Sequence, residues 1–154
     1  MKISTKGYYA VRAMLDMAFH GRQSPVPLSI ISSRQDISQH YLEQLFMKLR
    51  KSKLVKSVRG PNGGYLLARP PEEISIGDIF RAVEESISLL NCVAIQESNK
   101  TLCNKIDQCV SRLLWKRLTE NITRAFDSIN LKTLCREQEK LEHRTLNIER
   151  PTSK

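Results

Sequence analysis

The sequence contains no long hydrophobic run, and this absence limits the kinds of protein it can be. No stretch approaches the ~18 consecutive apolar residues of a membrane-spanning helix. The first residues, MKISTKGYYAVRAM, include no apolar stretch followed by a small-residue cleavage site, so we predict no signal peptide and a cytoplasmic location. No phosphate-cradling glycine loop with a lysine, HExxH sequence or Ser/His/Asp arrangement indicates an active site. We therefore expect a protein that is not an enzyme and has no membrane partner.

Acidic residues are scarce in the first half of the chain. Residues 1–69 contain 12 lysines and arginines against 3 aspartates and glutamates, whereas residues 70–154 contain 13 of each, so the whole net charge of +9 lies in the first half. Such a basic segment favours binding to a polyanion such as a nucleic acid, because neutralising phosphates releases condensed counterions. The alternative is a charge that serves solubility alone. With 40% hydrophobic residues, the 154-residue chain is long enough for one compact core.

Hydrophobic spacing predicts three helices in the first third of the chain. The first runs from Ser4 to about His20, and a short second helix stops near Gln35. A tight turn then leads into a third helix from about Ser38 to Ser52, with Ser38 as its candidate N-cap. Apolar residues recur in this third helix at spacings of three and four, which indicates one face toward the core and polar side chains elsewhere.

A glycine-rich hairpin is predicted after the third helix. Two short extended segments, Leu54–Arg59 and Tyr65–Ala68, flank the sequence GPNGG, whose glycines and asparagine supply the positive backbone angles of a hairpin tip. Another helix is predicted over Ile76–Glu85. This order of elements predicts a mainly α fold of the winged helix-turn-helix type, with residues 1–90 as the DNA-binding domain. The alternative is a small helical domain whose hairpin is only a turn.

In a winged helix-turn-helix protein, the second helix of the turn lies in the major groove of DNA. Gln44 can bond adenine bidentately, Glu43 can accept a hydrogen bond from cytosine, and Ser38 and Tyr41 can meet phosphates or bases. We expect Arg59 beside the minor groove and the wing glycines close to phosphate. The predicted DNA-binding residues are Ser4, Lys6, Tyr9, Ser38, His40, Tyr41, Glu43, Gln44, Arg59, Gly60, Gly63 and Gly64.

The rest of the chain divides into three predicted segments. Residues 91–109 contain three cysteines and no clear apolar period, so we expect a loop. Residues 110–135 form a predicted long helix whose apolar stripe is too extensive for one small domain to cover, which indicates a homodimer that reads a pseudo-palindromic site on double-stranded DNA. Residues 136–154 are a charged tail that we expect to be partly disordered. The stripe consists of Leu114, Leu118, Ile122, Ala125, Phe126 and Ile129.

Four stretches carry a family resemblance. They are STKGYYAVRAMLDMA, ISQHYLEQLFMKLRKSKLVKSVRGPNGGYLLAR, IGDIFRAVEES and LLWKRL. The chain resembles, over about residues 1–135, the IscR-type iron–sulfur regulators, a winged helix-turn-helix family that also includes the nitric-oxide-sensing NsrR-type repressors. Members are dimeric bacterial repressors and activators. The resemblance places Arg59 in the minor groove, and the best-known member has a serine at the position of His40. It also implies that the following residues lie at the recognition helix: Ser38, His40, Tyr41, Glu43 and Gln44.

Three cysteines, Cys92, Cys103 and Cys109, follow the spacing C-x10-C-x5-C. Thiolates are the usual ligands of iron–sulfur clusters, and a flexible loop lets three of them converge. The resemblance implies a [2Fe–2S] cluster bound by three cysteines and a histidine three residues after the last of them. That place is taken here by Arg112, which stays protonated and cannot bind iron. The fourth ligand therefore stays open among Glu97, Asn104, Asp107, Cys135, His143 and a residue of the other subunit.

The resemblance thus implies a homodimeric DNA-binding transcriptional regulator that senses redox, iron–sulfur or nitrosative state through a [2Fe–2S]-type cluster. One alternative is a regulator of the same fold that lacks a cluster and uses its cysteine thiols or a small effector. A second alternative is an electron-transfer or cluster-carrier protein whose positive charge docks an acidic partner.

Overall fold

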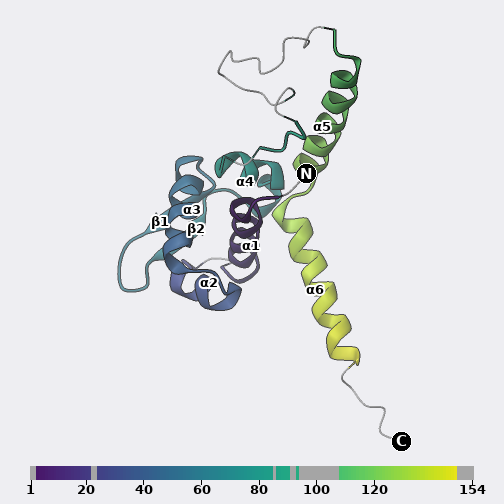
Figure 1. Cartoon of the computed structure of the whole chain (residues 1–154). Coiled ribbons are helices and arrows are strands. Elements are labelled where there is room, and N and C mark those ends of the chain that lie inside the picture. The colour runs from purple at the N-terminus through teal and green to yellow at the C-terminus, as the bar shows by residue number, and fades with distance from the viewer. Residues whose placement is uncertain (1–2, 22–23, 85, 91–92, 94–107, 149–154) are drawn as a thin grey trace, which may run out of the picture.

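Helices and one hairpin make up the secondary structure of residues 3–21, 24–84, 86–90, 93 and 108–148, which are the residues that the computed structural model describes. Figure 1 shows the first four helices in one unit with the hairpin at its edge, while the last two helices extend in opposite directions from this unit. The elements are α1 (Thr5–His20), α2 (Leu28–Gln35), α3 (Gln39–Lys51), β1 (Val55–Val58), β2 (Gly64–Leu67), the 3-10 turn η1 (Pro71–Glu73), α4 (Ile76–Ala82), α5 (Val110–Ser128) and α6 (Leu131–Ile148). This arrangement confirms the mainly α winged helix-turn-helix fold. Within the described residues, no helix is both long and apolar enough to cross a membrane.

Helix α3 forms where its apolar spacing predicts. Its four core residues, Leu42, Leu45, Phe46 and Leu49, are at most 2% exposed. The helix begins at the predicted N-cap, because the Ser38 hydroxyl accepts a hydrogen bond from the backbone N–H of residue 41 at 3.4 Å. The tight turn before it is made by Asp36, whose left-handed backbone (φ 51°) ends α2. The turn therefore fixes the direction in which α3 leaves α2.

A buried carboxylate joins α1 to α2. Asp16 on α1 is 4% exposed, and it is the only buried charged side chain among the described residues. Its oxygens accept hydrogen bonds from Arg34 at 3.1 Å and from the side-chain amide of Gln35 at 3.0 Å. Arg12, one turn earlier on α1, donates to the side-chain oxygen of Gln35 at 3.1 Å. Because a buried charge is stable only when it is paired and hydrogen-bonded, these contacts hold the two helices in one relative position.

The wing is an antiparallel hairpin that is attached to the core on one side. Val55 pairs with Leu67 at its base, and the ring of Tyr65 packs edge-on against Phe46 of α3 at 4.8 Å. Tyr65 also exchanges backbone hydrogen bonds with Val26, both at 2.9 Å. A Cβ atom on the preceding residue, Gly64, would lie 2.5 Å from the backbone of Val26, so only glycine permits this contact.

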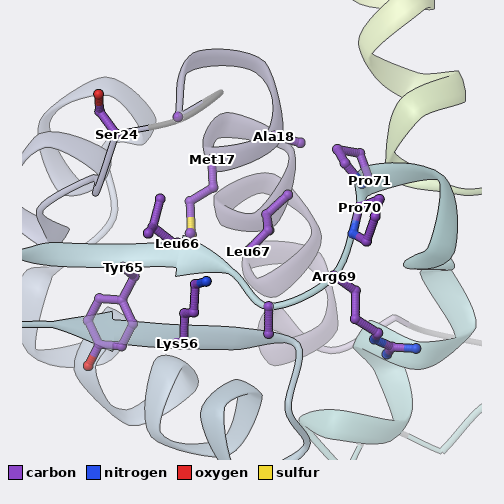
Figure 2. Close-up of a pocket in the computed structure, with 12 residues that line it drawn as sticks. Met17, Ala18, Ser24, Lys56, Tyr65, Leu66, Leu67, Arg69, Pro70 and Pro71 are labelled. Atoms are coloured by element: carbon purple, nitrogen blue, oxygen red, sulfur yellow. The ribbon is translucent and has the colours of Figure 1, made fainter.

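The other side of the wing faces a hollow of about 450 Å³ (Figure 2). Figure 2 shows that Leu66 projects from β2 on the side opposite to the Tyr65 ring. The hollow lies between this side of the hairpin, the end of α1 at Met17 and Ala18, and the Pro70–Pro71 segment. The base of the wing is thus tied to the core through one face, while its tip between residues 58 and 64 extends beyond the helices (Figure 1).

The C-terminal part corrects the expectation of a single long helix. The single helix predicted over residues 110–135 is two helices, because α5 ends at Ser128 and α6 begins at Leu131. Between them the chain pairs with the strand-like segment before α4: the N–H of residue 76 donates to the carbonyl of Ile129 at 2.9 Å, and the N–H of Leu131 donates to the carbonyl of residue 74 at 3.0 Å. Leu131 is fully buried. The charged tail is helical as far as Ile148, and residues 149–154 lie outside the described part.

Candidate nucleic-acid interface and cysteine segment

The exposed start of α3 carries three polar side chains in mutual contact, which we call the polar row: Glu43, His40 and Gln44. The amide nitrogen of Gln44 lies 3.2 Å from Nε2 of His40. The other ring nitrogen, Nδ1, lies 3.8 Å from a carboxylate oxygen of Glu43. The second oxygen of Glu43 accepts a hydrogen bond from the side chain of Gln39 at 3.3 Å. The structure therefore brings together three of the predicted DNA-binding residues.

The beginning of α1 lies beside this end of α3. The ring of Tyr9 meets that of Tyr41 edge-on, with centroids 5.9 Å apart. The guanidinium of Arg12 lies over the rings of Tyr8 and Tyr9, at 5.4 and 5.8 Å. Ser4 is the N-cap residue of α1, and Lys6 is half-buried in its first turn. The predicted contact residues of α1 and α3 thus lie on neighbouring elements, and sequence reasoning missed Arg12, whose position depends on a partner 23 residues away.

Arg59 and Gly60 are exposed at the tip of the wing, and Gly63 and Gly64 lie on its return side. Gly60 has a φ of 121°, which L side chains rarely adopt, and nothing lies within 4 Å of the place where its Cβ would be. The backbone conformation of the turn therefore requires glycine at this position. At Gly63, a Cβ would lie 2.5 Å from the carbonyl oxygen of Val58, so the tip can close only with glycine there.

One basic residue of α3 is paired with a carboxylate that lies just after α4. Lys48 forms an ion pair with Glu84 at 2.5 Å, and this hydrogen bond lowers the pKa of the Glu84 carboxyl. Glu84 lies just after α4 in a left-handed conformation, with φ of 58°. Arg50 and Lys51 are exposed at the same end of α3. Basic side chains therefore follow the polar row along α3, and one of them, Lys48, is paired with Glu84.

Cys109 is the described member of the predicted cluster ligands, and Cys92 and Cys103 lie outside the described residues. It is the N-cap residue of α5, and its sulfur lies 3.1 Å from the hydroxyl of Ser111. Hydrogen bonding from Ser111, and then from the backbone of Arg112, lowers the pKa of the Cys109 thiol. Since the thiolate is the form that binds metal, this environment fits a cluster ligand.

The fourth ligand is not found among the described residues. They contain no group of three or more histidine, cysteine or carboxylate side chains that could hold a metal ion. Arg112 is half-buried in the first turn of α5, and its protonated guanidinium has no electron pair to give to iron. Cys135 lies on α6, where burial raises the pKa of its thiol. Of the two described cysteines, Cys109 therefore has the environment that better suits a metal ligand.

A helix-turn-helix with a polar-faced second helix and a glycine-closed wing defines the chain as a winged helix-turn-helix DNA-binding protein. The profile of the Rrf2 family, described as iron-dependent transcriptional regulator, matches residues 3–137. The chain belongs to this family, so it is a DNA-binding transcriptional regulator and not an enzyme.

Curated relatives and solved structures extend the comparison. The chain is 47% identical over 142 residues to the HTH-type transcriptional regulator IscR of Xenorhabdus nematophila, covering 92% of this chain and 84% of that protein. It is 46% identical over the same span to IscR of Photorhabdus laumondii. The structure of T. potens IscR superposes with a TM-score of 0.73 at 40% identity, covering 92% of this chain and 90% of that one. CymR, the global cysteine regulator of B. subtilis, gives a TM-score of 0.71 at 37% identity, covering 89% and 98%.

Proposed function

We propose that the protein is a cytoplasmic homodimer that binds a pseudo-palindromic DNA site and senses redox, iron–sulfur or nitrosative state through a [2Fe–2S]-type cluster. The observation that carries the proposal is the similarity to IscR proteins over 92% of the chain. It is supported by the lowered pKa of Cys109 at the start of α5. The ligands that this chain would supply are Cys92, Cys103 and Cys109.

On DNA, the start of α3 enters the major groove and the wing tip reaches the adjacent minor groove. Support comes from the exposure of the polar row and of Arg59, and from the packing of Tyr9 against Tyr41, which places the first turns of α1 next to α3. Ser4, Lys6 and Tyr9 then contact the sugar–phosphate backbone, while Gln44 and Glu43 face base edges. Gly60, Gly63 and Gly64 let the wing backbone approach phosphate closely.

Dimer formation is proposed for α5. None of its 19 residues is buried, although four large apolar side chains lie on it at 38 to 80% exposure. A helix of this length spans about 28 Å, so an apolar stripe along it exceeds what one small domain covers. A second copy of α5 is the occupant that would cover it and present two α3 helices with two-fold symmetry. The exposed side chains are Val110, Leu113, Leu114 and Leu118.

When bound, a [2Fe–2S] cluster supplies reversible one-electron chemistry. The residues of this chain would anchor it at the start of α5, and Phe126 further along that helix packs against Phe80 of α4 with ring centroids 4.9 Å apart. Through this contact, α5 is connected to the core of the DNA-binding unit. A shift of DNA affinity or site choice requires the cluster to favour one of two conformations.

A second candidate is a regulator of the same fold that uses cysteine thiols without a cluster. The observation in its favour is the likeness to CymR of B. subtilis and to an oxidised form of Staphylococcus aureus CymR, which superposes with a TM-score of 0.65 at 36% identity. The two candidates differ in iron and sulfide content, which makes metal analysis decisive between them.

Arg59→Ala and Gln44→Ala should have different effects on DNA binding. Loss of Arg59 should weaken binding by about 1–3 kcal/mol for every duplex, because a groove or phosphate contact is removed. Loss of Gln44 should relax the preference at one base position in each half-site. Fluorescence anisotropy with duplexes that differ at single positions measures both effects. Equal weakening for all sequences by Gln44→Ala would mean that α3 does not read bases at this residue.

Leu118→Asp should dissociate the dimer, because burying an unpaired carboxylate in an apolar seam costs several kcal/mol. Lys116→Asp, which introduces the same side chain elsewhere on α5, is the matched control and should remain dimeric. Analytical ultracentrifugation measures the molecular mass of each variant. A Leu118→Asp protein that sediments as the wild type does would place the dimer interface on another surface.

Each of Cys92→Ala, Cys103→Ala and Cys109→Ala should abolish the visible absorption of protein purified without oxygen, because each removes a ligand. Cys135→Ala should keep the absorption. With an incomplete protein ligand set, the wild-type cluster should be lost readily in air, and Arg112→His should slow this loss. Iron and sulfide assays accompany the spectra. Wild-type protein from anaerobic, iron-replete cells that contains neither iron nor sulfide would favour the thiol regulator.

A further inference from the structure

We propose that His40 is a positioning residue that orients Gln44 for base recognition, and that its protonation weakens this recognition. The inference rests on the proposed placement of α3 in the major groove. It starts from the polar row, in which Nε2 of His40 lies 3.2 Å from the Gln44 amide nitrogen and Nδ1 lies 3.8 Å from Glu43. Each contact joins two residues that are three or four positions apart, which is about one turn along the exposed face of α3.

The chemistry of the three side chains fixes the position of the ring proton. The amide nitrogen of Gln44 can only donate, so Nε2 of His40 must accept. A neutral imidazole that accepts at Nε2 carries its proton on Nδ1, the nitrogen nearest the Glu43 carboxylate. That carboxylate favours the Nδ1–H form electrostatically, and Gln39 donates to its other oxygen. Glu43 therefore orients His40, and His40 in turn orients Gln44.

This arrangement leaves the recognition edge of Gln44 available. One N–H of its amide is directed to His40, while the amide oxygen and the second N–H stay unused by the polar row. An oxygen and an N–H side by side are the pair that bonds N6 and N7 of adenine. Because His40 distinguishes the oxygen from the nitrogen of the amide before DNA arrives, less conformational freedom is lost on binding.

Protonation of His40 reverses the orientation of the Gln44 amide. With protons on both ring nitrogens, Nε2 donates and opposes the N–H of Gln44, so the amide must turn its oxygen toward the ring. The Gln44 amide then directs an N–H toward the N6–H of adenine. Two donors face each other, and no hydrogen bond forms. At the same time the added charge attracts phosphate. Adenine preference should fall while sequence-independent affinity rises as the pH decreases.

The side chain of His40 is 81% exposed. Glu43 is the charged residue that contacts it on its own helix. From α1, which packs against this end of α3, Tyr9 reaches the same turn through Tyr41, and the guanidinium of Arg12 lies over the Tyr9 ring. Substitution of His40 therefore tests whether a pH dependence of adenine preference arises at this residue.

The experiment is selection from a library of randomised DNA duplexes at pH 8 and at about pH 5.5, followed by sequencing of the bound fraction. It compares full-length wild type, His40→Gln, His40→Ala, Gln44→Ala and His20→Gln at equal measured iron and sulfide content. Glutamine at position 40 can accept from Gln44 and donate to Glu43 as the neutral imidazole does, but it does not titrate. His20, which lies 3.9 Å from Asp16 at the end of α1, is the control for a histidine outside the polar row.

The wild type and His20→Gln should lose adenine preference at the position read by Gln44 by about fivefold or more between the two pH values, which corresponds to the lower limit for one bidentate base contact. His40→Gln should keep a high preference for adenine at both pH values, and His40→Ala should show a low preference at both.

Identical pH profiles for the wild type and His40→Gln would overturn the role of His40. If Gln44→Ala removes the preference but His40→Ala does not, the positioning role alone fails. If Gln44→Ala keeps it, the proposed docking of α3 fails instead.

Discussion

The buried carboxylate of Asp16 is the interaction on which the DNA-facing surface depends. It accepts hydrogen bonds from Arg34 and Gln35 on α2, and Arg12 donates both to the side chain of Gln35 and to its backbone carbonyl. Arg12 also covers the ring of Tyr9, which meets Tyr41 in the first turn of α3. A continuous set of contacts therefore runs from the buried charge to the start of α3. Without it, the left-handed turn at the end of α2 would not be held at a fixed angle to α1.

The molecule combines a basic DNA-binding unit with two helices that extend from it. The two parts are connected by the backbone hydrogen bonds around Leu131, by the contact between Phe80 and Phe126, and by the ion pairs Arg81–Asp127 and Lys132–Glu72. Gly77 belongs to the same region, because a Cβ there would lie 1.9 Å from the carboxylate of Asp127 on α5. Cys109 begins α5, while the dimer seam that we propose runs along the same helix. The proposed cluster ligand Cys109, the proposed dimer seam and the contact with the DNA-binding unit therefore share one element.

The sequence predicted the parts of the fold that follow from local patterns, such as the apolar face of α3, its N-cap at Ser38 and the glycines of the wing. It did not predict the break between α5 and α6, because the apolar stripe continues through Ile129 while the backbone at that point pairs with a segment more than 50 residues away. Nor did it predict the burial of Asp16, since a charged residue in an amphipathic helix is usually exposed. The candidate contact residues were found from residue type and position, but the row formed by Glu43, His40 and Gln44 depends on side-chain geometry.

The central claim is that two copies of the basic unit, held together through α5, bind one DNA site. The salt dependence of binding tests it most directly, because each neutralised phosphate releases counterions. A duplex recovered from the randomised library should bind with log K falling linearly against log salt concentration, at a slope of about −5 or steeper, as expected when a dimer contacts about six or more phosphates. A slope close to zero, or one that corresponds to a single unit with few phosphate contacts, would contradict the account.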